Sequence, residues 1–411
     1  MHRLFLPLLL MMHFSSNAKR LDVGRDKTYK SIKTALSVAR AFDTILVFSG
    51  TYKEGNIVVS RPVILLGKDL PILDGQKKYE IISIRSHFVT IKGFQLQHSG
   101  VATLDDPGAI KVYDHNFITI SDNVLEDNFF GIYIQYGKHC TIKNNKIRAY
   151  GDQEQLIGNG IHCWKSEKLT IVGNTVQGHR DGIYFEFVTH SLIKQNISKF
   201  NIRYGLHFMF SNDDDYIENT FHNNGAGVAV MFTNRVKMLN NVFEENWGDA
   251  AYGLMLKEIS DAEIRGNRFS KNTTGIYMEG TNRVVVKNNE LISNGWGMKI
   301  QASCMDNTIN YNNFVGNTFD ISTNGDLVLN NFDNNYWDKY EGYDLNRNGT
   351  GDVPYHPLSL FSVIVENNNS AMLLFRSTMT SLLDKSEKMI PSLTPSNFVD
   401  NSPRMYRLKY D

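Results

Sequence analysis

The sequence predicts an all-β protein folded as a right-handed parallel β-helix, a solenoid of about ten or eleven coils with a capping helix at its N-terminal end and a helical tail. An asparagine recurs in an I-x-x-N-x-[FLVI] unit at steps of 18 to 29 residues, with a mean of 23. A glycine that opens a short apolar strand follows most of these asparagines. The recurring residues are Asn123, Asn145, Asn174, Asn196, Asn219, Asn241, Asn267, Asn289, Asn312 and Asn330.

Helical repeat classes do not fit these units. Leucine-rich repeats share the period but need L-x-x-L-x-L with a helical segment, and tetratricopeptide and ankyrin units are longer and helical. The strands alternate in polarity and favour β-branched or aromatic residues, as in G-I-Y-F-E-F from Gly182. Stacked coils would bury a continuous core, and the amides of Asn174, Asn196, Asn219, Asn241, Asn267 and Asn289 would form a hydrogen-bonded ladder.

The first 18 residues are predicted to be a cleavable signal peptide. Met1 to Arg3 form a short basic region, Leu4 to Met12 an apolar one, and Ser16 to Ala18 a small-residue cleavage site. The chain is therefore expected to be exported. Its formal net charge is zero and it has no basic run, which argues against nucleic acid as a partner.

Beyond the signal peptide we expect two regions: β-helix over 19–340, with a cap helix at 28–41 that begins at Thr28, and a C-terminal loop and docking helix over 341–411. In the second region Ser370 to Ile390 carry an apolar stripe at helical spacing, ending at Pro391. This helix either caps the last coil or docks on a partner or a membrane surface. The three cysteines, Cys140, Cys163 and Cys304, are interpreted as small core residues.

A polar run near the end of the coils has the spacing of a calcium loop. Asp344, Asn346, Asn348 and Asp352 place oxygen donors around a turn glycine, Gly349, which suits a hard cation. Two of these positions are Asn rather than Asp, and no Glu stands at position twelve. An Asx-rich turn is the alternative interpretation.

Strand parity predicts two outward columns on the post-glycine strands. The first is Tyr133, His162, Tyr184, His207, Ala229, Met255, Tyr277 and Lys299, and the second is Gln135, Trp164, Glu186, Met209, Met231, Lys257, Glu279 and Gln301. A solvated strand face is usually rich in Thr, Lys and Ser, so an apolar strip here indicates a binding surface. Alternatively, the extra loop at 150–159 folds over the strip.

Imidazole and thioether groups gather on this strip. His207, Met209, Met231, Met255 and His162 are candidate ligands for transient Cu(I), because these soft and borderline donors suit copper better than magnesium or calcium. The alternative is that they are ordinary surface and gap-filling residues. The candidate partner-binding residues are Trp164, Tyr184, Glu186, Lys257, Tyr277 and Glu279.

An enzyme is the competing hypothesis. Exported β-helices often act on uronate polymers as lyases or epimerases, which need a base and a cation at the sugar carboxylate. Glu186, His207 and Lys257 share the outer face and would fill these roles. The strip is apolar for a sugar acid, which favours the binding hypothesis.

Several stretches resemble the NosD family of nitrous oxide reductase maturation proteins, which are periplasmic CASH-domain β-helices. They span roughly 155–395 and include N-G-I-H-C-W-K-S (159–166), G-H-R-D-G-I-Y-F-E-F-V-T (178–189), R-Y-G-L-H-F-M-F-S (203–211), N-W-G-D-A-A-Y-G-L-M-L-K-E-I-S (246–260) and N-Y-W-D-K-Y-E-G-Y-D (335–344). A generic β-helix would share the Asn step but not these outward side chains.

The resemblance implies a periplasmic accessory role without catalysis. The expected partners are nitrous oxide reductase, a membrane ABC transporter made of ATPase and permease subunits, and a lipoprotein copper chaperone. Together they would supply copper, or a copper–sulfur cargo, to the reductase. In this family the calcium-like run is richer in Asp than it is here.

Overall fold

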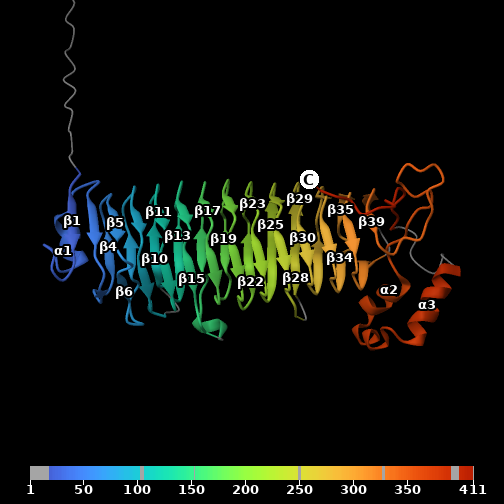
Figure 1. Cartoon of the computed structure of the whole chain (residues 1–411), viewed down its shortest axis with the longest axis horizontal. Coiled ribbons are helices and arrows are strands. Elements are labelled where there is room, and N and C mark those ends of the chain that lie inside the picture. Colours follow the sequence, from blue (N-terminus) through green and yellow to red (C-terminus); the bar gives the residue numbers. More distant parts are fainter. Residues whose placement is uncertain are drawn as a thin grey trace, which may run out of the picture.

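The computed structural model describes residues 18–101, 106–151, 153–248, 251–325, 329–389 and 398–410, so nearly all of the predicted signal peptide lies outside it. The chain winds into a right-handed parallel β-solenoid of about 13 turns, seen from the side as a rod in Figure 1. The predicted fold class is confirmed. There are more turns than the predicted ten or eleven, because the first coils lack the ladder asparagine; Phe94 stands in its place.

Three parallel sheets form the walls of the rod. The 14-stranded sheet consists of β1 (Arg20–Val23), β2 (Thr44–Val47), β5 (Ile64–Gly67), β8 (Thr90–Lys92), β11 (Thr119–Ser121), β14 (Thr141–Lys143), β17 (Thr170–Val172), β20 (Leu192–Lys194), β23 (Asp215–Ile217), β26 (Lys237–Leu239), β29 (Glu263–Arg265), β32 (Val285–Lys287), β35 (Met305–Asn310) and β38 (Leu329–Asp333). The 13-stranded sheet consists of β3 (Thr51–Tyr52), β6 (Ile72–Asp74), β9 (Gln95–Gln97), β12 (Val124–Glu126), β15 (Lys146–Arg148), β18 (Thr175–Gln177), β21 (Ile197–Lys199), β24 (Thr220–His222), β27 (Val242–Glu244), β30 (Arg268–Ser270), β33 (Glu290–Ile292), β36 (Asn313–Val315) and β39 (Tyr336–Trp337).

The 12-stranded sheet carries the post-glycine strands. It consists of β4 (Ile57–Val59), β7 (Ile82–Ile84), β10 (Gly108–Tyr113), β13 (Phe130–Gln135), β16 (Ile161–Trp164), β19 (Ile183–Glu186), β22 (Tyr204–Met209), β25 (Ala226–Asn234), β28 (Tyr252–Ser260), β31 (Thr274–Glu279), β34 (Trp296–Ile300) and β37 (Phe319–Ser322). Each strand pairs in parallel with its counterpart one coil away, so equivalent residues form columns along the rod.

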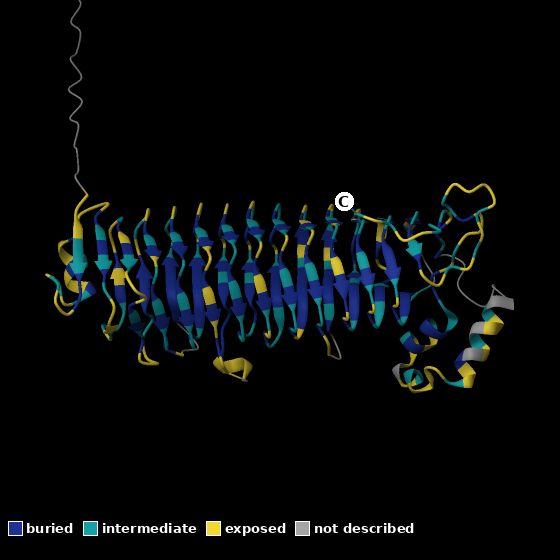
Figure 2. Cartoon of the chain, in the orientation of Figure 1, coloured by how far each residue is buried: buried dark blue, intermediate teal, exposed yellow. Residues whose placement is uncertain are grey.

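The core is a continuous apolar column inside the three sheets. In Figure 2 the buried residues, in dark blue, recur in the strands of each coil along the rod. Phenylalanine rings stack from coil to coil, with centroids 5.4 Å apart between Phe221 and Phe243 and 4.6 Å between Phe243 and Phe269. Cys140, Cys163 and Cys304 are buried and unbonded in this core. Stacking thus buries the apolar face that one coil alone would expose.

The predicted asparagine column forms an unbroken ladder. In Asn219 the side-chain amide donates to Oδ1 of Asn241 at 3.0 Å and to the carbonyl of Ile193 at 2.9 Å, while its backbone N–H donates to the same Oδ1. The other ladder residues, Asn174, Asn196, Asn241, Asn267 and Asn289, repeat this pattern. Each buried amide therefore has partners on both sides, which removes the cost of burying it.

The ladder ends differently from the sequence prediction. Asn330 belongs to another column, where it accepts from the amide of Asn307 at 2.8 Å. The true successor of Asn312 is Asn335, at a regular step of 23 residues. Asn335 in turn donates through its backbone and side chain to Asp400, at 3.0 and 3.1 Å. A carboxylate from the tail therefore takes the place of the next amide.

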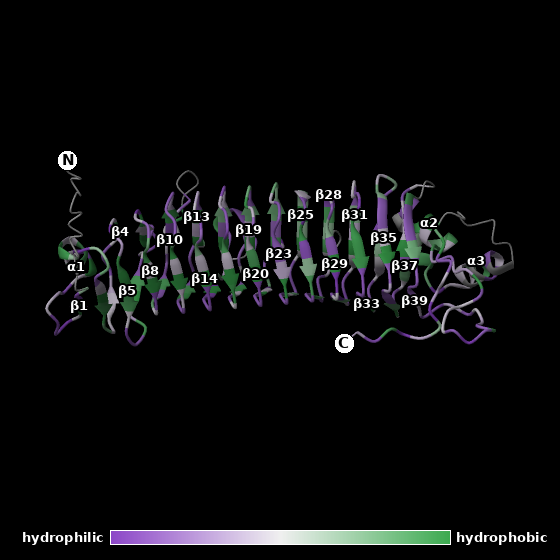
Figure 3. Cartoon of the chain, turned by 90° about the horizontal axis from the view of Figure 1, so that it is seen from above, coloured by the Kyte–Doolittle hydropathy of each residue, from purple (hydrophilic) through white to green (hydrophobic). Residues whose placement is uncertain are grey.

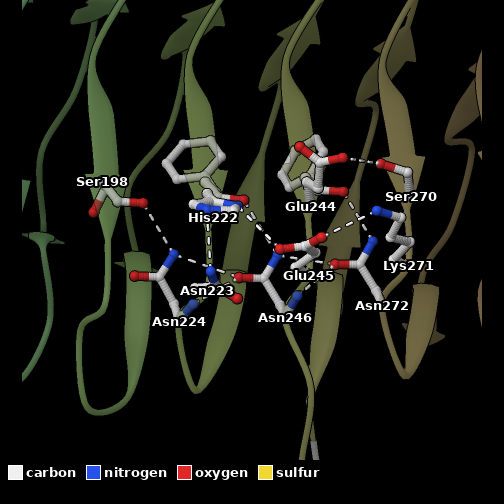
Figure 4. A network of polar contacts seen from close by, with 12 residues as sticks. Ser198, His222, Asn223, Asn224, Glu244, Glu245, Asn246, Ser270, Lys271 and Asn272 are labelled. Atoms are coloured by element: carbon white, nitrogen blue, oxygen red, sulfur yellow. Dashed lines mark hydrogen bonds and ion pairs between the residues drawn. The ribbon is translucent and has the colours of Figure 1, made fainter.

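A second asparagine ladder runs parallel to the first and was not predicted. Its members are Asn201, Asn224, Asn246, Asn272, Asn294 and Asn317. Figure 4 shows its middle rungs, where Asn224 donates to Asn246 and Asn246 to Asn272. Each member stands five residues after a first-ladder asparagine. In this stretch each coil is therefore hydrogen-bonded to the next at two of its turns, one in each ladder.

Helix α1 (Ile32–Val38) lies at the N-terminal end and is shorter than the predicted 28–41. Ser31, not Thr28, is its N-cap, because the hydroxyl of Ser31 accepts the N–H of Thr34. The carboxylate of Glu54 accepts the N–H groups of Ile32 and Lys33 at 2.7 and 2.9 Å. These acceptors satisfy the free amides of the first turn and fix where the helix begins.

The tail contains more helices than predicted. Helix α2 (Leu360–Asn367), the 3-10 helix η2 (Asn369–Leu374) and α3 (Thr378–Met389) replace the single helix expected from Ser370, and Ile390 and Pro391 lie outside the described residues. Another 3-10 helix, η1 (Glu154–Leu156), lies in the loop at 150–159. The last residues run back along the rod, as Figure 3 shows, and Leu408 exchanges two hydrogen bonds with Asn313.

Candidate functional site

The outer face of the 12-stranded sheet carries both predicted columns in register. Tyr184 pairs with His207, His207 with Ala229, and Ala229 with Met255. In the second column Glu186 pairs with Met209, Met209 with Met231, and Met231 with Lys257. Strands β25 and β28, with nine residues each, are the longest of this sheet. The four candidate soft donors His207, Met209, Met231 and Met255 therefore lie on three successive strands.

His207 faces outward but is covered, contrary to the open strand face expected from parity. Its side chain is 5% exposed and lies between the rings of Tyr184 and Tyr204, with centroids 5.0 and 4.8 Å away. Neither ring nitrogen has a hydrogen-bond partner among the described residues. The nearest charged group is the Asp181 carboxylate, 3.8 Å from Nδ1. A buried imidazole without partners is costly, so this ring is suited to a ligand.

A small residue separates the larger donors. Ala229 lies between His207 and Met255 in the first column, and its side chain is fully buried beneath its neighbours. Met255 is also covered, at 8% exposed, whereas Met209 and Met231 are partly exposed. Neighbouring strands are about 4.8 Å apart, so the small methyl of Ala229 leaves room between the imidazole of His207 and the thioether of Met255. This arrangement places exposed sulfur beside buried nitrogen.

His162 does not lie next to His207. The ring of Tyr184 stands between it and His207, with centroid distances of 4.8 and 5.0 Å. Burial lowers the pKa of His162 to about 3, so its imidazole is neutral at ordinary pH. Because the Tyr184 ring separates the two imidazoles, we place His162 in the ring stack that extends to Tyr133 and not beside the other donors.

Tyr184 connects the two columns. Its hydroxyl donates to the sulfur of Met209 at 3.7 Å and to Glu186 at 3.4 Å. Burial raises the pKa of Tyr184 to about 12, so the phenol keeps its proton. Beside it, Asp181 is buried and lies 3.7 Å from the guanidinium of Arg203. The donors thus lie next to a neutral phenol and a charge-paired carboxylate.

The loop at 150–159 reaches this face only at its edge. Glu154 pairs with Arg203 at 3.3 Å, and Leu156 is exposed. The described residues of the loop form hydrogen bonds with Arg180, Arg203 and His179, among others, and none with Met209 or Met231. The loop therefore leaves the methionine column uncovered.

The remaining predicted partner residues are distributed along the strip. Trp164 packs edge to face on Tyr136, with centroids 4.9 Å apart. At the other end Lys257 pairs with Glu279 at 3.0 Å, and the hydroxyl of Tyr277 donates to Glu279 at 3.1 Å. Glu186 and Lys257 are separated by Met209 and Met231 in their column. Glu186, His207 and Lys257, the three residues of the enzyme hypothesis, therefore do not meet at one point.

A row of exposed phenylalanines borders the second column and was not predicted. Phe187, Phe210 and Phe232 stack with centroids 5.1 Å apart in each pair and are 43%, 38% and 41% exposed. All three have φ between 52° and 54°, a left-handed conformation that bulky side chains rarely adopt. The signal in the sequence is a Phe five residues after Gly182, Gly205 and Gly227. We call these three residues the phenylalanine row.

The predicted calcium run forms a compact network of Asx turns. Asp344 accepts the N–H groups of Asn348 and Gly349, and Asp352 accepts the N–H of Leu345. Asn346 and Asn348 accept further backbone N–H groups. Over the described ranges, no group of three or more His, Cys, Asp or Glu side chains has the geometry of a metal site. These hydrogen bonds are those of an Asx-rich turn, and calcium binding by the run stays a prediction.

The tail packs on the end of the same face. Phe361 and Val365 of α2 pack against Phe319, and Glu366 accepts a salt bridge from Lys299 at 2.9 Å. The outer side of the tail is apolar and exposed at Leu373, Leu374, Met379 and Leu382. Within the described residues, no helix is both long enough and apolar enough to cross a bilayer.

The chain resembles known proteins in two ways. Residues 149–348 match the family model described as periplasmic copper-binding protein (NosD), and residues 80–212 match that of the right-handed β-helix region. A Pseudomonas aeruginosa protein described as a probable ABC transporter binding protein NosD is 29% identical over 138 residues. That match covers 33% of this chain and about a third of the relative, 32%. The resemblance inferred from the motifs is confirmed.

Solved structures share the fold at low identity. The A-module of mannuronan C-5 epimerase AlgE4 from Azotobacter vinelandii has a TM-score of 0.54 and 15% identity, over 74% of this chain and 89% of its own. A family 28 exopolygalacturonase from Yersinia enterocolitica has a TM-score of 0.50 and 11% identity, over 77% of each chain. At such identities the likeness shows the solenoid architecture and nothing about chemistry.

Proposed function

We propose that this chain is a periplasmic accessory protein of the NosD type, which handles copper during maturation of nitrous oxide reductase and catalyses no reaction itself. The observation that carries the proposal is the placement of His207, Met209, Met231 and Met255 on three neighbouring strands of one face; we call these four residues the donor cluster. The cluster lies inside the stretch that matches the NosD family model. Copper is here a cargo that the protein receives and passes on.

The donor set explains why the cargo would be Cu(I). Thioether sulfur and imidazole nitrogen are soft and borderline donors, which prefer Cu(I) to harder cations. Met209 and Met231 are partly exposed and are the first atoms that an arriving ion would meet. His207 lies beneath the tyrosine rings and offers ring nitrogens that lack hydrogen bonds. Weak ligation by flexible thioethers suits a site that must also release the ion.

Docking surfaces flank the cluster. The phenylalanine row and Trp164 border the methionine column, so a copper chaperone lipoprotein or the reductase would bind here during transfer. The exposed apolar side of the helical tail would contact the permease of the ABC transporter, whose ATPase subunit lies across the membrane. The name of the Pseudomonas relative supports an association with a transporter. Exposed apolar patches of this kind usually mark protein interfaces.

The test removes the donors and keeps the packing. The variant His207→Phe, Met209→Leu, Met231→Leu retains ring and side-chain volume but has no donor atom at these positions. We expect it to fold, to lose retention of Cu(I) against a chelator under reducing conditions, and to lower reductase activation in cells. The matched control is His139→Phe, Met305→Leu; both residues are exposed, His139 in the turn before β14 and Met305 at the start of β35. Normal copper retention and activation in the triple variant would refute the assignment.

A further inference from the structure

A buried carboxylate lies beside the candidate ligand His207. Asp181, in the bend before β19, is 1% exposed, and its Oδ2 lies 3.8 Å from Nδ1 of His207. The other oxygen, Oδ1, accepts the backbone N–H of Tyr204 at 3.4 Å and lies 3.7 Å from Nε of Arg203. Nε of Arg180 is 4.0 Å from Oδ2. Because the two arginines compensate the charge of Asp181, the carboxylate does not require a cationic imidazole.

The chemistry of the two groups determines which nitrogen of a neutral His207 carries the proton. An ionised carboxylate only accepts hydrogen bonds, whereas neutral imidazole has one N–H and one nitrogen with a lone pair. The nitrogen nearest to Asp181 is Nδ1, so the N–H is favoured there. Nε2 then keeps the lone pair with which imidazole binds a metal ion. Asp181 thus selects one donor atom of the ring.

The imidazole of His207 lies close enough to Asp181 for a small movement to complete a hydrogen bond. The 3.8 Å between Nδ1 and Oδ2 exceeds the usual length of about 2.7–3.2 Å. The imidazole is held by ring contacts with Tyr184 and Tyr204 and by no hydrogen bond among the described residues, so its plane can turn. A cation on Nε2 would make Nδ1–H a stronger donor, which favours this movement when the cargo binds.

His162, one of the same outward column, has the opposite environment. The side-chain amide of Asn159 donates to Nδ1 of His162 at 3.2 Å, so Nδ1 accepts and the proton of the neutral ring is on Nε2. Asn159 and Asp181 are equivalent residues of successive coils, since each stands two residues before the paired Ile161 and Ile183. An amide in one coil and a carboxylate in the next therefore favour different tautomers in two histidines of one face.

We propose that Asp181 is a positioning residue of the donor cluster: it accepts the Nδ1–H of His207 and leaves Nε2 as the nitrogen that binds Cu(I). The inference rests on the proposed function for its cargo, but the position of the proton is a property of the chain without copper. A carboxylate behind a ligating imidazole fixes the orientation of the ring and makes the opposite nitrogen a better donor.

Nitrogen NMR of the copper-free full chain, with isotope label in histidine alone, tests the proposal. At about pH 7.5 we expect the signals of His207, which are those missing from His207→Phe, to show a proton on Nδ1 and none on Nε2. His162 is the internal control and should show the reverse. A proton on Nε2 of His207, whether in the neutral ring or in an imidazolium, overturns the proposal.

Asp181→Asn tests the consequence for copper. The amide matches the carboxylate in size but donates as well as accepts, so the preference for Nδ1–H is lost. We expect retention of Cu(I) against a chelator to weaken by about tenfold or more. The matched control is Asp213→Asn, in the turn before β23, which also removes a carboxylate paired with an arginine and should retain Cu(I) as the parent chain does. Unchanged retention in Asp181→Asn overturns the role of Asp181.

A second variant separates positioning from packing. Asp181→Glu keeps the carboxylate but adds a methylene to a buried site, whereas Asp181→Asn keeps the size and loses the carboxylate. Positioning predicts that Asp181→Glu retains Cu(I) better than Asp181→Asn, and the reverse order overturns the proposal. A parent chain that retains no Cu(I) refutes the proposed function instead, and the NMR of the copper-free chain still decides the tautomer of His207.

Discussion

Buried polar groups are hydrogen-bonded in the interior ladders but not all of them are on the outer face of the 12-stranded sheet. Inside, the amide of Asn219 has a partner above, a partner below and a carbonyl beside it. Outside, His207 is buried almost as completely, yet neither of its ring nitrogens has a partner. The interior repeats one residue from coil to coil, whereas the outer column changes residue on every strand.

This difference separates the groups that specify the fold from those that the proposed function assigns to a ligand. A buried polar group that is fully satisfied by its copies costs little and fixes the register of the coils. A buried group left unsatisfied lowers stability, and it persists where another role maintains it. His207 is therefore the buried polar group on the outer face that the fold does not account for. The contrast predicts three changes in the free energy of unfolding, given below from the largest to the smallest.

The largest effect is expected from breaking the interior ladder. Asn219→Leu would leave the backbone N–H and amide of Asn196 and the carbonyl of Ile193 without acceptor or donor. We expect the free energy of unfolding to fall by about 3 kcal/mol, measured by urea denaturation. The control Asn367→Leu, on the exposed side of α2, should change it by less than about 0.5 kcal/mol. A loss as small in Asn219→Leu would show that the ladder contributes little.

An intermediate effect is expected at Asp320, which is buried at the end of the sheet with one oxygen unpaired. Burial raises the pKa of this carboxyl from 3.8 to about 6, although Lys339 lies 3.3 Å away. The folded protein therefore prefers the neutral acid, and stability contributed by this group is lost as the pH rises from about 4 to 6. Asp320→Asn should increase the free energy of unfolding at pH 7.5 by about 1–3 kcal/mol.

The pH dependence distinguishes this effect from a general change in packing. Near pH 4 the parent carboxyl is protonated in the folded state, so the variant and the parent should differ by less than about 0.5 kcal/mol. Urea denaturation at the two pH values provides the measurement. An equal gain at both values would mean that ionisation of Asp320 is not its cause.

The smallest effect on stability is expected on the outer face. Phe210→Asn loses two ring stacks but places a residue that tolerates positive φ where the backbone has φ of 52°. These contributions oppose each other, so the free energy of unfolding should change by less than about 1 kcal/mol. Capture of the copper chaperone on immobilised protein should nevertheless weaken several-fold. Unchanged capture would remove the phenylalanine row from the docking surface.

The structural features that repeat from coil to coil can be predicted from the sequence. The asparagine step predicts the stacked coils, and strand parity predicts which residues face outward, including Met209 and Met231. The second ladder was also detectable, since Asn201 and its equivalents stand at a constant offset from the first. It was missed because Asn128 and Asn201 are separated by coils with other residues there, among them the buried His179.

Other features depend on contacts that no local pattern shows. His207 is covered because the rings of Tyr204 in the same strand and of Tyr184 one coil earlier pack against it. Asp400 ends the ladder from 65 residues away, and no spacing in the sequence indicates this contact. The tail divides into α2 and α3 because Asn368 begins a separate turn, η2, between them.

The carboxylate at the end of the ladder has a consequence for the evolution of length. Asp400 accepts the amide of the last ladder residue, Asn335. A duplicated unit of about 23 residues inserted before Asn312 would therefore have a ladder asparagine on each side and would leave the contact with Asp400 unchanged. Each such insertion would move the tail about 4.8 Å farther from the methionines. The number of coils therefore sets the distance between the tail and the methionines in steps of one strand spacing.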